Sequence, residues 1–107
     1  MGAGEDPLFH TRFETQVIYW RGPSPFFFAP IPRHYAEDLG GVARIVTYGW
    51  GMIPVEARIA GVAFNTSLYP KDGTFLLPLK MDIRRKTNIT AGDLIVVDLI
   101  IHPPAGG

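Results

Sequence analysis

The sequence predicts a mainly β protein: a small six-stranded β-barrel, closed or partly split, with two short helices, in the order ββαβββαβ. Three observations lead to this class. Apolar and polar residues alternate over several short segments, which is the period of half-buried strands. Dipeptides that favour tight turns separate these segments. Closing the strands into a barrel removes exposed edges that would otherwise promote aggregation.

The central part of the chain, residues 54–80, predicts three consecutive strands. Val55–Ile59 alternates between apolar and charged side chains, and Ala60-Gly61 supplies the turn that follows. Val62–Tyr69 then forms a second strand with two different faces. One face carries Val62, Phe64, Thr66 and Leu68, and the other carries Ala63, Asn65, Ser67 and Tyr69.

The third central strand follows a turn at Pro70–Gly73, where Asp-Gly favours the positive φ angles of a tight hairpin. Thr74–Lys80 is apolar on both faces, so we expect both faces to be covered. Pro78 has no N–H to donate to a neighbouring strand. We therefore expect an edge, a bulge or the end of the barrel at this residue.

Three further strands flank this centre. Phe13–Trp20 alternates and predicts the first strand, Phe26–Ala29 predicts a short second one, and Leu94–Ile101 predicts the last and most apolar one. Residues 21–25 predict a turn, and residues 48–51 a loop. Because three consecutive Phe residues must point to both faces, at least one of them lies in the core or in a pocket wall.

Two short helices complete the prediction. Arg33–Leu39 predicts the first, with a less regular turn reaching Thr47, because apolar residues recur at helical spacing: Tyr35, Leu39, Val42 and Val46. Gly40-Gly41 interrupts this segment, because each glycine destabilises a helix by about 1 kcal/mol relative to alanine. After Lys80 we expect a second helix with Asp82 as its N-cap and Asn88 in the left-handed conformation that ends it.

Composition limits the protein class. The 107 residues predict a single domain, with an ordered core over about residues 8–102 and flexible termini. Ten basic residues balance ten acidic ones, which disfavours nucleic acid and anionic membranes as partners. There is no cysteine and no cofactor-binding motif. Neither a secretion signal nor a long apolar segment is present, so we expect a cytoplasmic protein.

Several motifs together resemble the bacterial family called domain of unknown function 1905. They are FxTxV from Phe13, Gly49-Trp50-Gly51, VxAxIxGxxFxTSLYP from Val55, LLPLK from Leu76 and AGDLIVV from Ala91. The resemblance extends from about residue 13 to residue 101. It implies a six-stranded barrel whose ends are closed by short helices, with no established activity. Phe26 and Phe64 replace residues that are commonly Trp in the family, and smaller aromatic residues in a wall would enlarge an internal cavity.

The candidate ligand-binding residues are aromatic residues near the barrel ends, polar residues on one strand, and cations after a strand end. They are Tyr19, Trp20, Phe28, Trp50, Asn65, Ser67, Lys80 and Arg84. The aromatic residues either pack in the core or line a pocket. Asn65 and Ser67 either point into the barrel or lie on its surface, and Thr66 belongs to the opposite face. Lys80, Arg84 and Arg85 either bind a carboxylate or phosphate or form a solvated helix end.

The remaining titratable residues give weaker signals. Asp98 either is buried with a raised pKa or pairs with Arg12 or Arg58 on a neighbouring strand. The three histidines, His10, His34 and His102, lack the spacing of metal ligands, so we expect no metal site. No sequence motif identifies a catalytic residue.

These observations predict a small-molecule-binding β-barrel with an apolar cavity, and leave open whether it is also a cofactor-independent enzyme. The expected ligand is an apolar or aromatic small molecule, with or without an anionic group. The alternative is a non-catalytic protein-interaction module that forms a homodimer through the Phe-rich strand and the first helix. We expect no cofactor, and either a monomer or a homodimer.

Overall fold

The computed structural model describes residues 6–21, 26–46 and 51–103. Most of the turn expected at residues 21–25 and of the loop expected at 48–51 lies outside the described residues. The same is true of the candidate residue Trp50 and of both ends of the chain.

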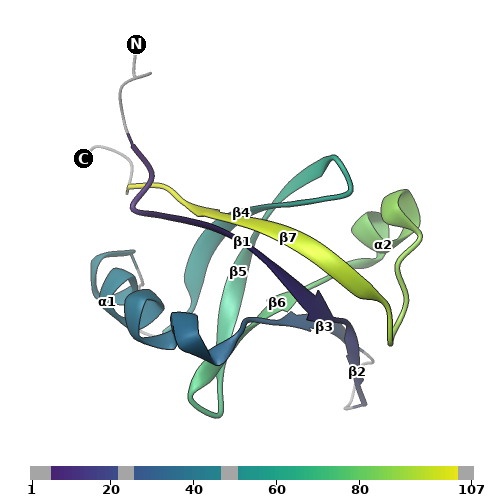
Figure 1. Ribbon diagram of the computed structural model, residues 1–107, viewed down its shortest axis with the longest axis horizontal. Helices are drawn as coiled ribbons and strands as arrows, with labels where there is room; N and C mark the ends of the chain where they lie inside the picture. Colours follow the sequence, from purple (N-terminus) through teal and green to yellow (C-terminus); the bar gives the residue numbers. More distant parts are fainter. Residues whose placement is uncertain (1–5, 22–25, 47–50, 104–107) are drawn as a thin grey trace.

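Seven antiparallel strands form one sheet in the described part of the chain, in the order β1-β7-β4-β5-β6-β3-β2, and this sheet curls into a half-barrel (Figure 1). The strands are β1 (Phe9–Gln16), β2 (Ile18–Trp20), β3 (Phe26–Pro30), β4 (Ile53–Ile59), β5 (Val62–Lys71), β6 (Thr74–Pro78) and β7 (Leu94–Ile101). The helices are α1 (Ala36–Val46), which follows a short 3-10 turn at Arg33–Tyr35, and α2 (Met81–Thr87). The mainly β class is confirmed, and the last strand has the bounds expected of it.

The expected strand Phe13–Trp20 is in fact two strands, and this accounts for the difference between six and seven. Val17 lies between them, with its N–H donating to the carbonyl of Asp93 (2.9 Å) and its carbonyl accepting from Gly92 (2.8 Å). The chain then turns away from β7, and β2 pairs with β3 instead. Alternation continues through Val17, which is buried, so the pattern of apolar residues does not reveal the break.

Strand β5 joins the two halves of the curled sheet. Its first part, Val62–Leu68, pairs with β4, and its last part, Tyr69–Lys71, pairs with β6. The turn between β5 and β6 consists of Asp72 and Gly73, which have φ angles of 48° and 80°. Both angles are positive, as the Asp-Gly sequence predicts for a two-residue hairpin turn. Strand β5 therefore extends two residues further than expected.

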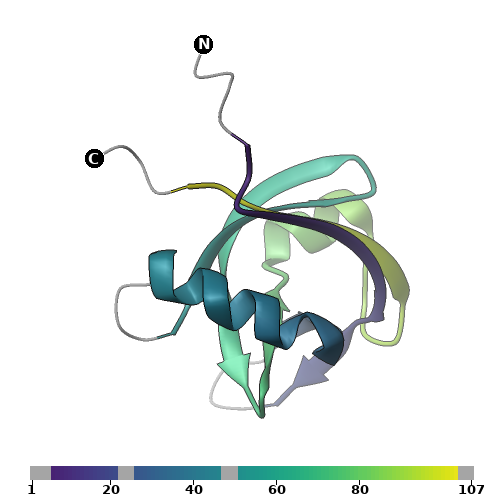
Figure 2. The same ribbon diagram turned by 60° about the vertical axis from the view of Figure 1, so that its left-hand side comes forward.

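Helix α1 does not end at the two glycines, as the sequence analysis expected. It continues through Gly40 and Gly41 to Val46 and lies across the open side of the curled sheet (Figure 2). Leu39 is fully buried, and Val42 and Val46 pack against the core. The apolar face predicted from helical spacing is thus confirmed, and its burial outweighs the cost of two glycines inside a helix.

Helix α2 lies at the opposite end of the sheet from α1 (Figure 1). Its N-cap position is occupied by Lys80, which makes no side-chain capping hydrogen bond. The expectation that Asp82 is the N-cap is wrong by two positions, and its carboxylate instead accepts a hydrogen bond from the N–H of Ile83 (3.0 Å). Asn88 ends the helix in the left-handed conformation (φ 58°), as expected.

The concave side of the sheet is filled by packed apolar side chains. The buried core cluster comprises Phe13, Val17, Ala29, Ile31, Leu39, Ile53, Val55, Ala57, Ile59, Leu68, Phe75, Leu77, Leu79, Ile95, Val97, Leu99 and Ile101. These side chains occupy the space in which the sequence analysis placed an apolar cavity. None of the described helices is both long enough and apolar enough to cross a membrane.

Charged residues pair on the outer face of β1, β7 and β4. Arg12 forms a two-pronged ion pair with Asp98 at 2.8 and 3.1 Å, and Glu56 binds both Arg58 (3.1 Å) and His102 (2.9 Å). The hydrogen bond from Arg12, together with its positive charge, lowers the pKa of Asp98. Of the two alternatives for Asp98, the surface pair is therefore correct.

Candidate functional site

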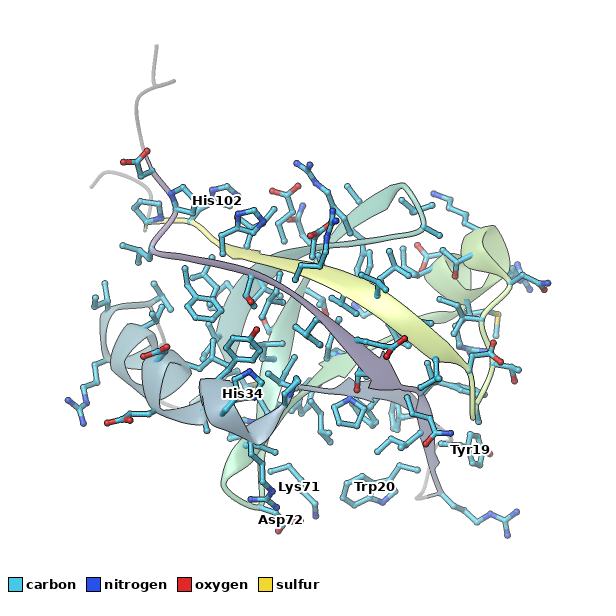
Figure 3. All side chains as sticks on the ribbon, viewed as in Figure 1. Tyr19, Trp20, His34, Lys71, Asp72 and His102 are labelled. Atoms are coloured by element: carbon cyan, nitrogen blue, oxygen red, sulfur yellow. The ribbon has the colours of Figure 1, made fainter. Side chains whose placement is uncertain are left out.

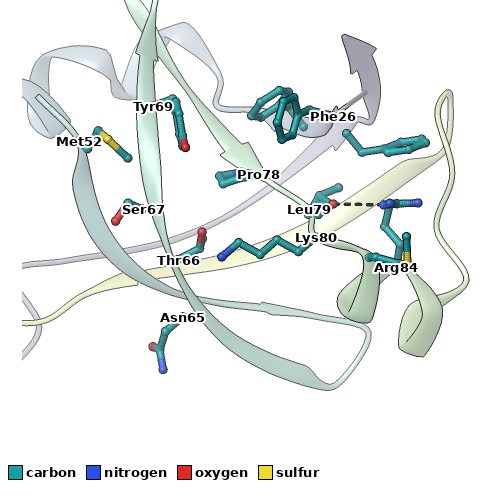
Figure 4. A pocket seen from close by; sticks show the side chains of 13 residues that line it. Phe26, Met52, Asn65, Thr66, Ser67, Tyr69, Pro78, Leu79, Lys80 and Arg84 are labelled. Carbon is teal, nitrogen blue, oxygen red and sulfur yellow. Dashed lines mark hydrogen bonds between the residues drawn. The ribbon is translucent and has the colours of Figure 1, made fainter. Parts of the chain in front are cut away.

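An open groove of about 670 Å³ lies on the surface, where β5 and β6 separate (Figure 4). Strand β5 forms one side of it, and β3, the end of β6 and the start of α2 form the other. The lining residues are Phe26, Phe27, Phe28, Met52, Asn65, Thr66, Ser67, Tyr69, Pro78, Leu79, Lys80, Met81 and Arg84. The candidate site is thus a surface groove and not the enclosed cavity that was expected.

Pro78 is the reason that the two strands separate. Near the hairpin turn, Leu76 of β6 lies opposite Tyr69 of β5. Two residues further along, Pro78 has no N–H to offer to β5, and it lies opposite Phe28 of β3. Leu79 then donates its N–H to the carbonyl of Phe27 (2.9 Å). The end of β6 therefore follows β3 and leaves β5 without a neighbour on that side.

Aromatic rings from both sides of the groove, from β3 and from β5, pack against each other. The Phe28 ring lies 6.0 Å from that of Phe26 and 6.1 Å from that of Tyr69, measured between centroids. Phe28 is buried, whereas Phe26 is 51% exposed and Tyr69 is 46% exposed. Side chains of this kind can contact a large apolar surface of a ligand at a small cost in conformational entropy.

Two cations complete the lining. The Nε atom of Arg84 donates to the carbonyl of Leu79 (3.2 Å), and its guanidinium group lies 4.0 Å above the centre of the Phe27 ring. These two contacts fix the orientation of the guanidinium group and leave its terminal N–H groups free to bind an anion. Lys80 is exposed and extends across the groove toward Thr66 (Figure 4). Neither cation has an ion-pair partner among the described residues.

Polar residues from both faces of β5 line the groove. The side chains of Asn65 and Ser67 lie on the outer face, and Thr66 lies on the opposite face. All three nevertheless line the groove, because the groove follows the free edge of the strand. The outward orientation of Asn65 and Ser67 is therefore correct, but it does not remove them from the candidate site.

Five of the eight candidate residues from the sequence line the groove: Phe28, Asn65, Ser67, Lys80 and Arg84. Tyr19 and Trp20 do not. Tyr19 packs edge-on against Phe27, with the ring centroids 5.0 Å apart. Trp20 lies beside Lys71 (Figure 3), whose Nζ is 4.1 Å from the centre of the indole ring. Trp50 lies outside the described residues.

The eight candidates leave out most of the apolar lining. The lining residues that are not among them are Phe26, Phe27, Met52, Thr66, Tyr69, Pro78, Leu79 and Met81. Two signals pointed to some of them: the three consecutive Phe residues, and a proline inside a strand. Phe26 lines the groove, whereas Phe64 packs against the core.

Among the described residues that line the groove there is no His, Asp, Glu or Cys. The hydroxyl and amine groups of the lining belong to Thr66, Ser67, Tyr69 and Lys80. In the part of the chain that the structure describes, no three His, Asp or Glu side chains are grouped so that they could hold a metal ion. The chemistry that this arrangement supports is the binding of an anion with an apolar body.

Comparison with known proteins places the chain in a family. The chain matches none of the curated proteins. Residues 13–99 match the profile of the family described as "Domain of unknown function (DUF1905)". The match includes every strand of the groove and helix α2, and it confirms the resemblance seen in the sequence motifs. The chain is a member of the DUF1905 family.

Proposed function

We propose that this protein binds a small molecule with an apolar or aromatic body and an anionic group in the groove between β5 and β6. One observation carries the proposal: the described lining combines aromatic and aliphatic side chains with two cations and no acidic residue, although the whole chain has no net charge. Apolar walls with a few converging polar groups are typical of ligand sites.

The two cations have different roles in this proposal. Arg84 is oriented by Leu79 and Phe27, so its planar fork can bind a carboxylate through two parallel hydrogen bonds. Lys80 is exposed and has a long side chain, so it can adjust its position to the ligand. The body of the ligand lies against Phe26, Phe28 and Tyr69. Binding is the function that this lining supports best.

The proposal is tested with two probes that share a phenylalkyl body, titrated by NMR at low ionic strength: 4-phenylbutyrate, which ends in a carboxylate, and 4-phenylbutanol, which ends in a neutral hydroxyl. We expect the carboxylate to bind at least tenfold more tightly, since hydrogen bonds to charged groups contribute about 1.5–3 kcal/mol. Arg84→Gln should remove most of this difference. Equal affinity for both probes, or no binding of either up to millimolar concentration, contradicts the proposal.

The chain offers a matched control on the same helix. Arg85 and Lys86 are exposed cations that do not line the groove. Arg85→Gln removes the same charge from α2 as Arg84→Gln does, but it should leave the affinity for 4-phenylbutyrate nearly unchanged. A similar loss in both variants would mean that the net charge of the protein, and not the groove, determines binding.

The alternative function, a homodimeric interaction module, has one observation in its favour. Exposed aromatic side chains adjoin each other on the outer face of the sheet, with Trp20 38% exposed, Phe26 51% and Tyr69 46%. Such surfaces occur in protein interfaces. Sedimentation equilibrium over a range of concentrations tests it: a dimer that Phe26→Ser dissociates would favour this alternative, and a monomer at all concentrations would exclude it.

A further inference from the structure

We propose that the ligand of the groove is a short extended peptide with a free C-terminal carboxylate, which pairs with the backbone of β5 as an additional strand. This inference rests on the proposed function, because it specifies the chemical class of the anionic ligand. It follows from the direction in which the backbone groups of β5 point, which the register of the sheet determines.

The register places the N–H and C=O groups of Asn65 and Ser67 on the side facing away from β4. In an antiparallel pair of strands, residues that exchange two hydrogen bonds alternate with residues that exchange none. Ser67 lies opposite Pro54, and proline has no N–H, so this pair cannot exchange two bonds. The backbone groups of Ser67 therefore point away from β4, and by alternation those of Asn65 do so too.

The two hairpin turns at the ends of β5 lead to the same assignment. Each turn has two residues, so the residues that flank it form a hydrogen-bonded pair. At one end, Val62 pairs with Ile59 of β4, so even-numbered residues of β5 bond to β4. At the other end, Lys71 pairs with Thr74 of β6, so odd-numbered residues bond on the β6 side. Asn65 and Ser67 are odd-numbered, and on their β6 side lies the groove.

No strand of the described chain pairs with Asn65 or Ser67 on this side. Pairing between β5 and β6 covers Tyr69–Lys71 only, because β6 follows β3 from Pro78 onward. The result is a short strand edge, free in the described structure, that borders an apolar groove. A free edge of this kind is the element to which proteins add an extended peptide as a further strand.

The rest of the lining suits the other parts of such a peptide. Phe26 and Pro78 line the groove on the side opposite β5 (Figure 4), and Phe28 lies beside Pro78 in the sheet. Together these three residues can receive an apolar side chain. Lys80 and Arg84, which lack an ion-pair partner in the described structure, can bind the terminal carboxylate. A single ligand with amide groups, an apolar side chain and a carboxylate thus uses each class of group that borders the groove.

The test compares four probes by NMR titration of the ¹⁵N-labelled protein. They are N-acetyl-Leu-Phe with a free carboxylate, its C-terminal amide, its analogue methylated on the Phe nitrogen, and 4-phenylbutyrate. We expect the free acid to bind most tightly, and both N-methylation and amidation to weaken it about tenfold, because each removes a pairing group. The amide protons of Asn65 and Ser67 should move downfield, whereas those of Thr66 and Leu68, which bond to β4, should move little.

Two proline variants test the same point from the side of the protein. Ser67→Pro removes an N–H that points into the groove, whereas Ala63→Pro removes one from the same edge outside the groove. Neither N–H bonds to β4. Only Ser67→Pro should abolish binding of N-acetyl-Leu-Phe. If either variant does not fold, the N-methylated probe and the amide shifts still decide the question.

The outcomes separate this inference from the proposed function. If 4-phenylbutyrate binds as tightly as N-acetyl-Leu-Phe and N-methylation has no effect, the peptide is excluded and the anion site remains. If none of the four probes binds, both are excluded. Binding of the free acid that depends on its N–H, together with shifts at Asn65 and Ser67, supports both.

Discussion

Replacing the two glycines inside α1 by alanine should stabilise the protein. Both lie within the helix, and a Cβ atom built on either of them has no other heavy atom within 4 Å. Neither substitution therefore causes a clash. Alanine is favoured over glycine inside a helix by about 1 kcal/mol, so Gly40→Ala and Gly41→Ala together should add about 2 kcal/mol to the free energy of unfolding. For a domain of this size, each should raise Tm by about 4–8 °C.

Urea denaturation followed by circular dichroism measures this change, and a third glycine supplies the control. Gly73 has a φ of 80° in the hairpin turn between β5 and β6, so Gly73→Ala should destabilise the protein by about 1–2 kcal/mol. The two kinds of substitution thus have opposite signs. If Gly40→Ala and Gly41→Ala instead lower stability or leave it unchanged, α1 is not one continuous helix packed as described, and the reasoning is refuted.

Three other substitutions test the packing, the join between sheet halves and the surface charges. Leu77 is fully buried, so Leu77→Ala should cost about 2–5 kcal/mol in urea denaturation, and a cost below about 1 kcal/mol would contradict the packed interior. Thr15 donates its hydroxyl to the carbonyl of Pro30 (2.7 Å), joining β1 to β3, so Thr15→Val should cost about 1 kcal/mol in the same assay. The pKa of Glu56 is lowered from 4.5, mainly by its hydrogen bond with His102 and also by the one from Arg58. The ionised carboxylate therefore stabilises the fold above pH 4.5. This stabilisation is lost as the pH falls through the lowered pKa of the folded protein. The difference in free energy of unfolding between the unaltered protein and Glu56→Gln should accordingly shrink between pH 6 and pH 3. A constant difference would show that Glu56 has the same pKa in the folded and the unfolded protein.

Local sequence signals predicted the strands and turns well wherever one physical rule governed them. Alternation and Asp-Gly identified β5 and its hairpin turn, and an apolar run interrupted only by Asp98 identified β7 with its bounds. Asn88 was recognised as the end of α2 because few residues other than glycine adopt the left-handed conformation. In each case the information lies within a few neighbouring residues.

The errors arose where distant parts of the chain decide the outcome. Val17 belongs to an uninterrupted alternating run, and the break in the strand there depends on pairing with residues 92 and 93. Gly40 and Gly41 are weak helix formers, and the burial of Leu39 compensates for them. Neither effect can be read from a local window, because it depends on contacts across the sheet.

The candidate site was predicted in part for a related reason. Lys80 and Arg84 could be paired from sequence because they lie close together, at the end of a strand and in the helix that follows. The order of strands in the sheet places β3 and β5 on opposite sides of one groove, and this order could not be predicted from the sequence. Pro78 was expected to mark an edge, a bulge or the end of the barrel, but the strand that loses its neighbour there, β5, could not be identified without the register.

The position of β7 in the sheet has a consequence for how the protein folds. This strand comes last of the seven along the chain, yet it lies between β1 and β4 and pairs with both. The residues of the earliest strand therefore pair with residues 78 to 92 positions further along the chain. A chain emerging from the ribosome cannot complete the part of its sheet that contains β1, β7 and β4 until β7 has been synthesised. Such long-range pairing favours slow folding, with β1 exposed to chaperones until β7 arrives.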